Sequence, residues 1–166
     1  FDINSEELIR IVTKLNNGYD YTNNKLDSMT NFNIGAVVNP GADNLDKELE
    51  KFKNKIKNGA TFFQTQAIYD PETLQSIIEI KEKKDIKIFA GLIPIKSVKM
   101  ANYLNTKVPG ITVPENIIKL METTDDPQNT CVQINKEIIS EIKDMKGIDG
   151  IHIMALGWEH LIPKMI

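Results

Sequence analysis

The chain has 166 residues, 41% hydrophobic and 26% charged, with a net charge of −3 and an isoelectric point near 5.5. These values predict one folded domain over residues 1–166 and argue against a nucleic-acid partner. The apolar runs at 88–95 and 151–156 are much shorter than the roughly 20 residues of a membrane-spanning helix, so we expect no membrane partner. The single cysteine, Cys131, precedes an amphipathic pattern and is expected to be an ordinary thiol. One cysteine cannot form an internal disulfide, which is typical of proteins in a reducing compartment such as the cytoplasm.

Hydrophobic periodicity and turn residues predict strands that alternate with helices. The predicted strands are 32–38, 61–66, 85–94 and 150–156, and the predicted helices are 5–17, 45–58, 71–84, 97–104, 114–121, 125–145 and a closing helix from 157. Strict alternation favours parallel strands with right-handed crossovers. The pattern fits either a small complete sheet or half of a larger one, because four strands cannot close an eight-stranded barrel.

The most informative stretch is 58–70, NGATFFQTQAIYD, a helix end, a strand and a helix start. A strand buried on both faces is expected to be apolar throughout, yet Gln64, Thr65 and Gln66 interrupt this one at its carboxyl end, where ligands bind in α/β folds. These side chains either cap the strand or face a ligand. An amide that donates and accepts can read the edge of a planar heterocycle, which makes Gln66 the first candidate.

Polar residues or glycine follow every predicted strand, at Asn39, Gln66, Lys96 and Gly157, which places a possible site along one rim. Three other features have two readings each. Lys51 and Lys55 lie one helical turn apart and are either a solvated face or a pair facing a phosphate. Asp125-Asp126 before Pro127 is read as a helix N-cap rather than a metal site. His152 is read as a hydrogen-bonded core residue rather than a ligand.

Five segments in order resemble the carboxyl half of the methylenetetrahydrofolate reductase barrel. They are FNIGAVVNPG, KIKNGATFFQTQAIYD, IFAGLIPIKS, VPENIIKLMETTDD and GIDGIHIMALGWEHLIP. The resemblance implies an α/β fold, the C-terminal half of a TIM (β/α)8 barrel with four parallel strands. It also implies FAD at the carboxyl rim, reduction of 5,10-methylenetetrahydrofolate to 5-methyltetrahydrofolate, and NADH or another reductant as electron donor. The ending HIMALGWE is most similar to the branch of anaerobic one-carbon-metabolising bacteria, and the family acts in methionine biosynthesis.

The resemblance also assigns cofactor residues. Lys55 matches a basic residue that contacts the phosphate-bearing arm of the flavin, and Lys51 lies one turn before it. Glu48 stands where an acidic residue contacts the cofactor. Asn39 occupies a position that is commonly a tyrosine against the flavin.

The same comparison assigns substrate residues. Gln66 matches the glutamine that binds the folate pterin. Met154 and Trp158 replace an aromatic residue and an arginine that help to hold folate, so substrate contacts are expected to differ here. His152 matches a histidine of the eighth strand, which we interpret as structural.

No catalytic residue is expected in this chain, because the general acid and an aspartate near the flavin belong to the first and fourth strands of such a barrel and would precede Phe1. We therefore expect an upstream half-barrel segment or a companion chain, or a homo-oligomer, to cover the two open strand edges. The alternatives are a noncatalytic half-barrel module that binds a ligand or a partner, and an unrelated small α/β binding domain.

Overall fold

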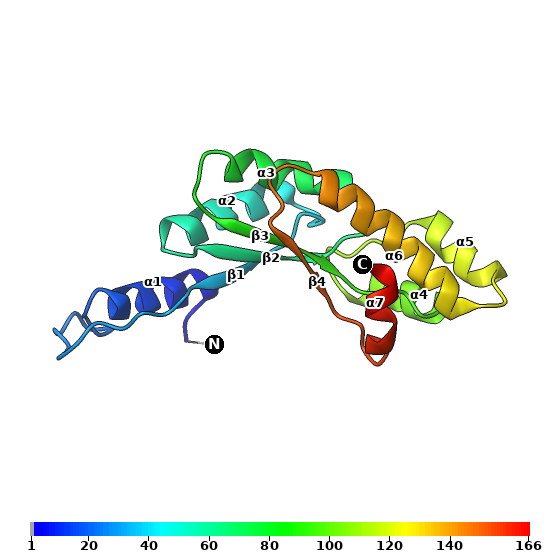
Figure 1. Cartoon of the computed structure of the whole chain (residues 1–166). Coiled ribbons are helices and arrows are strands. Elements are labelled where there is room, and N and C mark those ends of the chain that lie inside the picture. Colours follow the sequence, from blue (N-terminus) through cyan, green and yellow to red (C-terminus); the bar gives the residue numbers. More distant parts are fainter. Residues whose placement is uncertain (1) are drawn as a thin grey trace.

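The computed structural model describes residues 2–166 and contains one parallel sheet. Its strands are β1 (Gly35–Val38), β2 (Phe62–Ala67), β3 (Lys87–Leu92) and β4 (Gly150–Ile153), in the spatial order β1-β2-β3-β4. Strand order thus equals chain order (Figure 1). A doubly wound sheet reverses its order at a switch point, whereas a sector of a TIM barrel does not. The parallel α/β prediction is confirmed, and the arrangement is that of half such a barrel.

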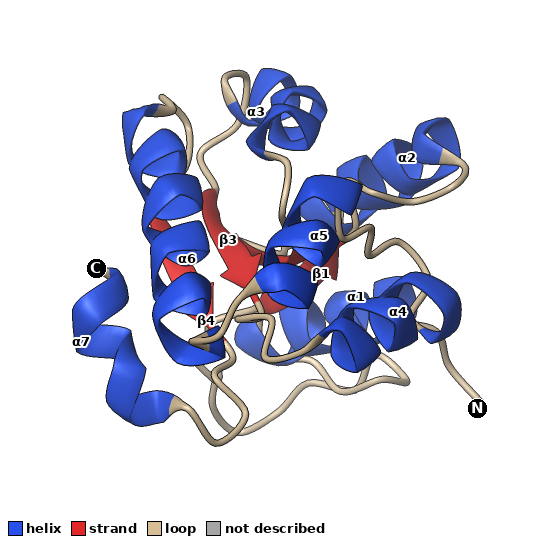
Figure 2. Cartoon of the chain, turned by 90° about the vertical axis from the view of Figure 1, so that its right-hand side faces the viewer, coloured by secondary structure: helices blue, strands red, loops and turns tan. Residues whose placement is uncertain are grey.

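The connections between strands are helical. The helical elements of residues 2–166 are α1 (Ser5–Asn16), α2 (Leu45–Lys57), η1 (Pro71–Leu74), α3 (Gln75–Lys81), α4 (Val98–Lys107), α5 (Glu115–Thr123), α6 (Pro127–Asp144), η2 (Glu159–Leu161) and α7 (Ile162–Met165). Helices α2, α3 and α6 lie on the same side of the sheet, and Figure 2 shows the helices arranged around the strands. The core fills the space between these helices and the sheet, where the rings of Phe52 and Phe63 meet edge to face with centroids 4.6 Å apart.

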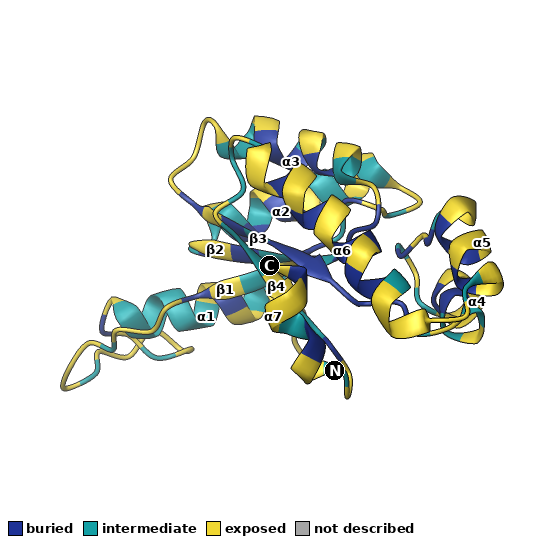
Figure 3. Cartoon of the chain, turned by 45° about the vertical axis from the view of Figure 1, so that its right-hand side comes forward, coloured by how far each residue is buried: buried dark blue, intermediate teal, exposed yellow. Residues whose placement is uncertain are grey.

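Side chains alternate between the two faces of the sheet. In β2, Phe63, Thr65 and Ala67 are buried toward the helices, while their neighbours point to the opposite side and are more exposed. We call this opposite side the open face, and it comprises Val37, Phe62, Gln64, Gln66, Phe89 and His152. Val37 and Phe62 are 54% and 37% exposed there, and Figure 3 shows the exposed and partly exposed segments of the strands. In a closed barrel this side would be the interior.

Element ends differ from the sequence-based predictions where local hydrogen bonds compete. Strand β1 begins at Gly35 rather than at Phe32, because Asn16 on α1 holds Phe32 through both its backbone N–H and its carbonyl. Strand β4 ends at Ile153 rather than at Leu156, because its partner strand ends at Leu92. Among residues 2–166, no helix combines the length and the apolar character needed to cross a membrane.

Candidate functional site

A β-bulge lies beside Gln66 near the end of β2. The pairing of β2 with β3 shifts register between Gln64 and Ala67. The buried hydroxyl of Thr65 accepts a hydrogen bond from the N–H of Gly91 at 2.8 Å and donates to the carbonyl of Gln66 at 2.7 Å. A Cβ at Gly91 would lie 2.5 Å from the carbonyl oxygen of Thr65, so only glycine allows this approach. Burial alternates regularly along β2, and this alternation puts the partly exposed Gln66 on the open face at the carboxyl end of the sheet, beside the bulge.

Gln64 and His152 form a polar pair on the open face. Nε2 of Gln64 lies 3.0 Å from Nδ1 of His152, two strands away, on the face where Gly91 between them has no side chain. The side chain of His152 is exposed, so its assignment to the core was wrong, although it is hydrogen-bonded as expected. The reason is register: residue 152 pairs with Gly91 and points to the open face, which the helices do not cover.

A second group lies where β3 and β4 end. The ammonium of Lys96, after β3, donates to the carbonyl of Leu156 and lies 5.6 Å from the ring centroid of Trp158. Met154 directly follows β4, and its N–H donates to the carbonyl of Leu92 at 2.8 Å. Met154 and Trp158 are partly buried against the core. The predicted substrate residues thus divide between the ends of β2 and β4, on one rim.

The four predicted cofactor residues cluster at the carboxyl end of β1. Lys55 is only 8% exposed, and its ammonium donates to the carbonyl of Val37 at 2.7 Å. It is therefore no solvated lysine. One carboxylate oxygen of Glu48 accepts from the N–H of Asn39 at 3.1 Å, and the other lies 3.8 Å from Nζ of Lys51. These contacts hold the start of the loop that follows β1.

Asn39 joins this loop to the loop between α4 and α5. Its side-chain oxygen accepts from the N–H of Gly41 at 3.2 Å, and its amide nitrogen donates to the carbonyl of Pro109 at 3.5 Å. Gly110 has φ +76°, and a Cβ there would collide with the Asn39 amide. Two cavities of about 260 and 340 Å³ flank the junction and share Gly41, Gly110 and Thr112 as lining residues. The first is mainly polar and the second mainly apolar.

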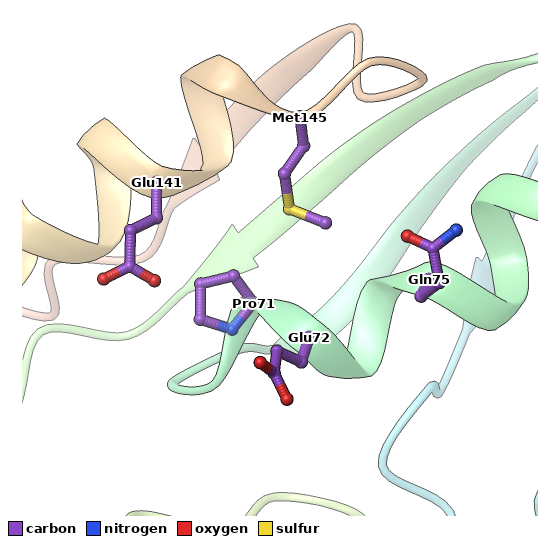
Figure 4. Close-up of a pocket in the computed structure, with 5 residues that line it drawn as sticks. All are labelled: Pro71, Glu72, Gln75, Glu141 and Met145. Atoms are coloured by element: carbon purple, nitrogen blue, oxygen red, sulfur yellow. The ribbon is translucent and has the colours of Figure 1, made fainter.

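A larger cavity of about 480 Å³ lies in the helical layer between η1 and α6. Figure 4 shows Pro71 and Met145 with the carboxylates of Glu72 and Glu141. It shares no lining residue with the open face, and we assign no part of the site to it.

Two further residues show how the core and the caps are built. Cys131 lies inside α6, within the predicted helix 125–145, and is fully buried, which raises the pKa of its thiol to about 11. Its segment looked polar because the buried positions Cys131, Val132 and Asn135 alternate with exposed polar residues. Asp126 accepts from the N–H of Asn129 at 3.1 Å, which confirms the predicted N-cap.

The structure adds two features that sequence patterns did not reveal. The pairing of Gln64 with His152 joins residues 88 positions apart. The contacts of Lys96 with Leu156 and Trp158 join two loops about 60 positions apart. Only the recurrence of polar residues after the strands pointed toward the second contact, and no sequence signal pointed toward the first.

Comparison with known proteins places these features in a family. The family model described as methylenetetrahydrofolate reductase matches residues 6–166. A solved structure from Clostridium thermocellum, of a protein that binds two copies of 5-methyl-5,6,7,8-tetrahydrofolic acid, has the same fold with a TM-score of 0.59 and 22% identity. The match covers 79% of this chain and 50% of that one.

The chain also has 30% identity over 120 residues to UDP-N-acetylmuramoylalanine–D-glutamate ligases of Francisella tularensis strains WY96-3418 and FTNF002-00 / FTA. That match covers 71% of this chain but spans only 27% of the ligases, so it gives no function to the chain. The family match, by contrast, covers nearly every residue that the structure describes. The chain belongs to the methylenetetrahydrofolate reductase family.

Proposed function

We propose that the chain is the C-terminal half of a flavin-dependent enzyme that reduces 5,10-methylenetetrahydrofolate to 5-methyltetrahydrofolate. The observation that carries this proposal is the partly exposed Gln66 on the open face at the carboxyl end of β2, within a chain of this family. The Gln66 amide offers two donors and an acceptor, which suits the donor and acceptor edge of a pterin. Met154 and Trp158 would line the remainder of the substrate site from the end of β4.

The residues at the end of β1 suit the flavin FAD, whose role when bound is to deliver hydride to the folate carbon. An ammonium has three N–H donors, and the structure assigns one from Lys55, to Val37. The side chain of Lys51 is 48% exposed, one turn away on α2. These two lysines would hold the phosphate-bearing arm, while Asn39 and Glu48 shape the loop beside it. NADH or another reductant would reload the flavin.

An upstream half-barrel segment or companion chain would complete the active site. The open face as described carries amides, an imidazole and apolar side chains but no carboxylate. The proposed general acid must then come from the other half, which would also cover Val37 and Phe62 and pair with the edge strands β1 and β4. Self-association is the second way to cover these edges. Such a folate reductase would work in the cytoplasm.

Absorbance and turnover test the proposal directly. The protein is purified with any polypeptide that accompanies it, and the mass of each polypeptide is measured by intact-mass spectrometry. A visible absorbance spectrum reports bound flavin. Turnover is then measured as the reduction of 5,10-methylenetetrahydrofolate, with reduced FAD supplied as the hydride donor. Gln66→Ala is expected to lower kcat/KM for the folate about tenfold or more while the flavin stays bound, because one pterin hydrogen-bonding partner is lost. Gln75→Ala, which removes an exposed amide in the outer layer, is the matched control. A colourless protein without turnover in the presence of both halves would contradict the proposal.

The second candidate is a noncatalytic half-barrel module that binds folate. The absence of a carboxylate from the described open face favours it, as does the ability of the C. thermocellum protein of the same fold to bind 5-methyltetrahydrofolic acid. Folate binding without flavin absorbance or turnover would support this candidate over the reductase.

A further inference from the structure

Lys96 is held in place by the loop that follows β4. Its ammonium donates to the carbonyl of Leu156 and lies 5.6 Å from the ring centroid of Trp158, within the range of a cation–π contact. One contact restrains the ammonium by a hydrogen bond and the other through the face of an aromatic ring. The flexible lysine side chain is therefore fixed at its charged end before any ligand arrives.

The loop that provides these contacts has an unusual backbone. Leu156 has φ +51°, a left-handed conformation that is uncommon for leucine, and its side chain is 60% exposed. Gly157 follows with φ +97°, and its N–H donates to the carboxylate of Glu159 at 2.7 Å. No apolar burial of Leu156 explains this conformation. Its structural effect is to present the Leu156 carbonyl to Lys96, and strained residues of this kind cluster at ligand sites.

Lys96 has no carboxylate partner among the ion pairs of residues 2–166. The contrast with the opposite end of the same strands is clear, since Lys81 and Lys87 there both pair with Asp149. Glu159 is the nearby acid, but its carboxylate serves the backbone of its own loop. A fixed ammonium with donors left over and no carboxylate of the described chain within ion-pair distance suits an external anion.

We propose that Lys96 binds a carboxylate of the ligand and that Leu156 and Trp158 are its positioning residues. The inference rests on the proposed function, because folate is a ligand with a heterocycle at one end and two carboxylates at the other. With the pterin at Gln66 on β2, the glutamate end of folate lies at the ends of β3 and β4. Lys96 then selects folates by their charged tail, separately from recognition of the pterin.

The test compares folic acid with its dimethyl ester, which keeps the rings and the chain but loses both negative charges. Binding to the purified protein, with any polypeptide that co-purifies, is measured by calorimetry. Quenching of Trp158, the only tryptophan of the chain, provides a second readout beside the site. Lys96→Gln is expected to weaken the affinity for folic acid about tenfold, because one charge-assisted hydrogen bond is lost. The same variant is expected to change the affinity for the ester by less than about twofold.

Two further variants complete the test. Lys96→Arg keeps the charge and is expected to retain most of the affinity for folic acid. Lys99→Gln removes an exposed charge nearby on α4 and should leave the affinity for both ligands unchanged. If Lys96→Gln loses the same affinity for folic acid as for the ester, or loses affinity for neither, the assignment of Lys96 is overturned while the folate proposal stays intact. A wild-type protein that binds neither ligand would overturn the proposed function, and the role of Lys96 with it.

Discussion

Thr65→Val removes the hydroxyl that builds the bulge beneath the proposed pterin site while keeping the shape of the side chain. The hydroxyl makes two hydrogen bonds, one from the N–H of Gly91 and one to the carbonyl of Gln66, and Thr65 is 2% exposed. A hydrogen bond contributes about 1 kcal/mol net, and a buried group left without a partner costs about 1–3 kcal/mol. The free energy of unfolding is therefore expected to fall by about 3 kcal/mol.

Urea denaturation followed by far-ultraviolet circular dichroism measures this loss, and a fall in Tm of roughly 6–12 °C is expected for a chain of this size. Thr123→Val is the matched control, because it removes a hydroxyl that bonds a carbonyl on the exposed surface of α5. Folate affinity should fall in Thr65→Val but not in the control, since Gln66 loses its fixed orientation. A change within about 0.5 kcal/mol of wild type, or an equal change in the control, would refute the account of the bulge.

Two other predictions concern titratable groups. Burial alone would raise the pKa of Asp149, but hydrogen bonds from Lys81 and the N–H of Ile88 outweigh it and hold the pKa below its usual value. A lowered folded-state pKa means that the carboxylate stabilises the fold above its unfolded pKa and loses this effect as the pH falls through the folded value. Asp149→Asn should lower the free energy of unfolding by about 1–2 kcal/mol at pH 7 and by less near pH 3. The exposed Asp144→Asn is the control. A difference in stability between wild type and Asp149→Asn that is as large at pH 3 as at pH 7 would contradict this prediction. Burial raises the pKa of Cys131 to about 11, so iodoacetamide at pH 8 should modify it only in denaturant, and rapid labelling of the folded protein would disprove its burial.

Several parts of the fold could be predicted from local sequence. Apolar periodicity located every strand and helix, and residues with side-chain caps such as Asp126 and Ser97 marked helix starts within a residue or two. Strand ends were less well predicted, as at Phe32, because contacts with α1 rather than the intrinsic preference of the segment decide where pairing begins.

The candidate site was only partly visible in the sequence. Gln66 stood out because it is a polar residue that interrupts an apolar strand, and this signal can be read from the local sequence alone. Lys55 looked like one of five surface lysines of its helix, and its burial depends on how α2 packs against β1. His152 looked like a core residue because the alternation of a strand shows that neighbours face opposite sides but not which side is covered.

The sequence by itself determined the family, the alternation of strands and helices and the place of Gln66 at a strand end, because these depend on local pattern and on motifs contiguous in the chain. Only the tertiary structure decided which face of the sheet stays open, how the Thr65 hydroxyl holds the bulge beside Gln66, and which distant residues meet, such as Gln64 with His152 and Lys96 with Trp158. The physical reason is that register, bulges and loop contacts arise from packing between segments far apart in the chain, and a local pattern contains no information about the partner it will meet.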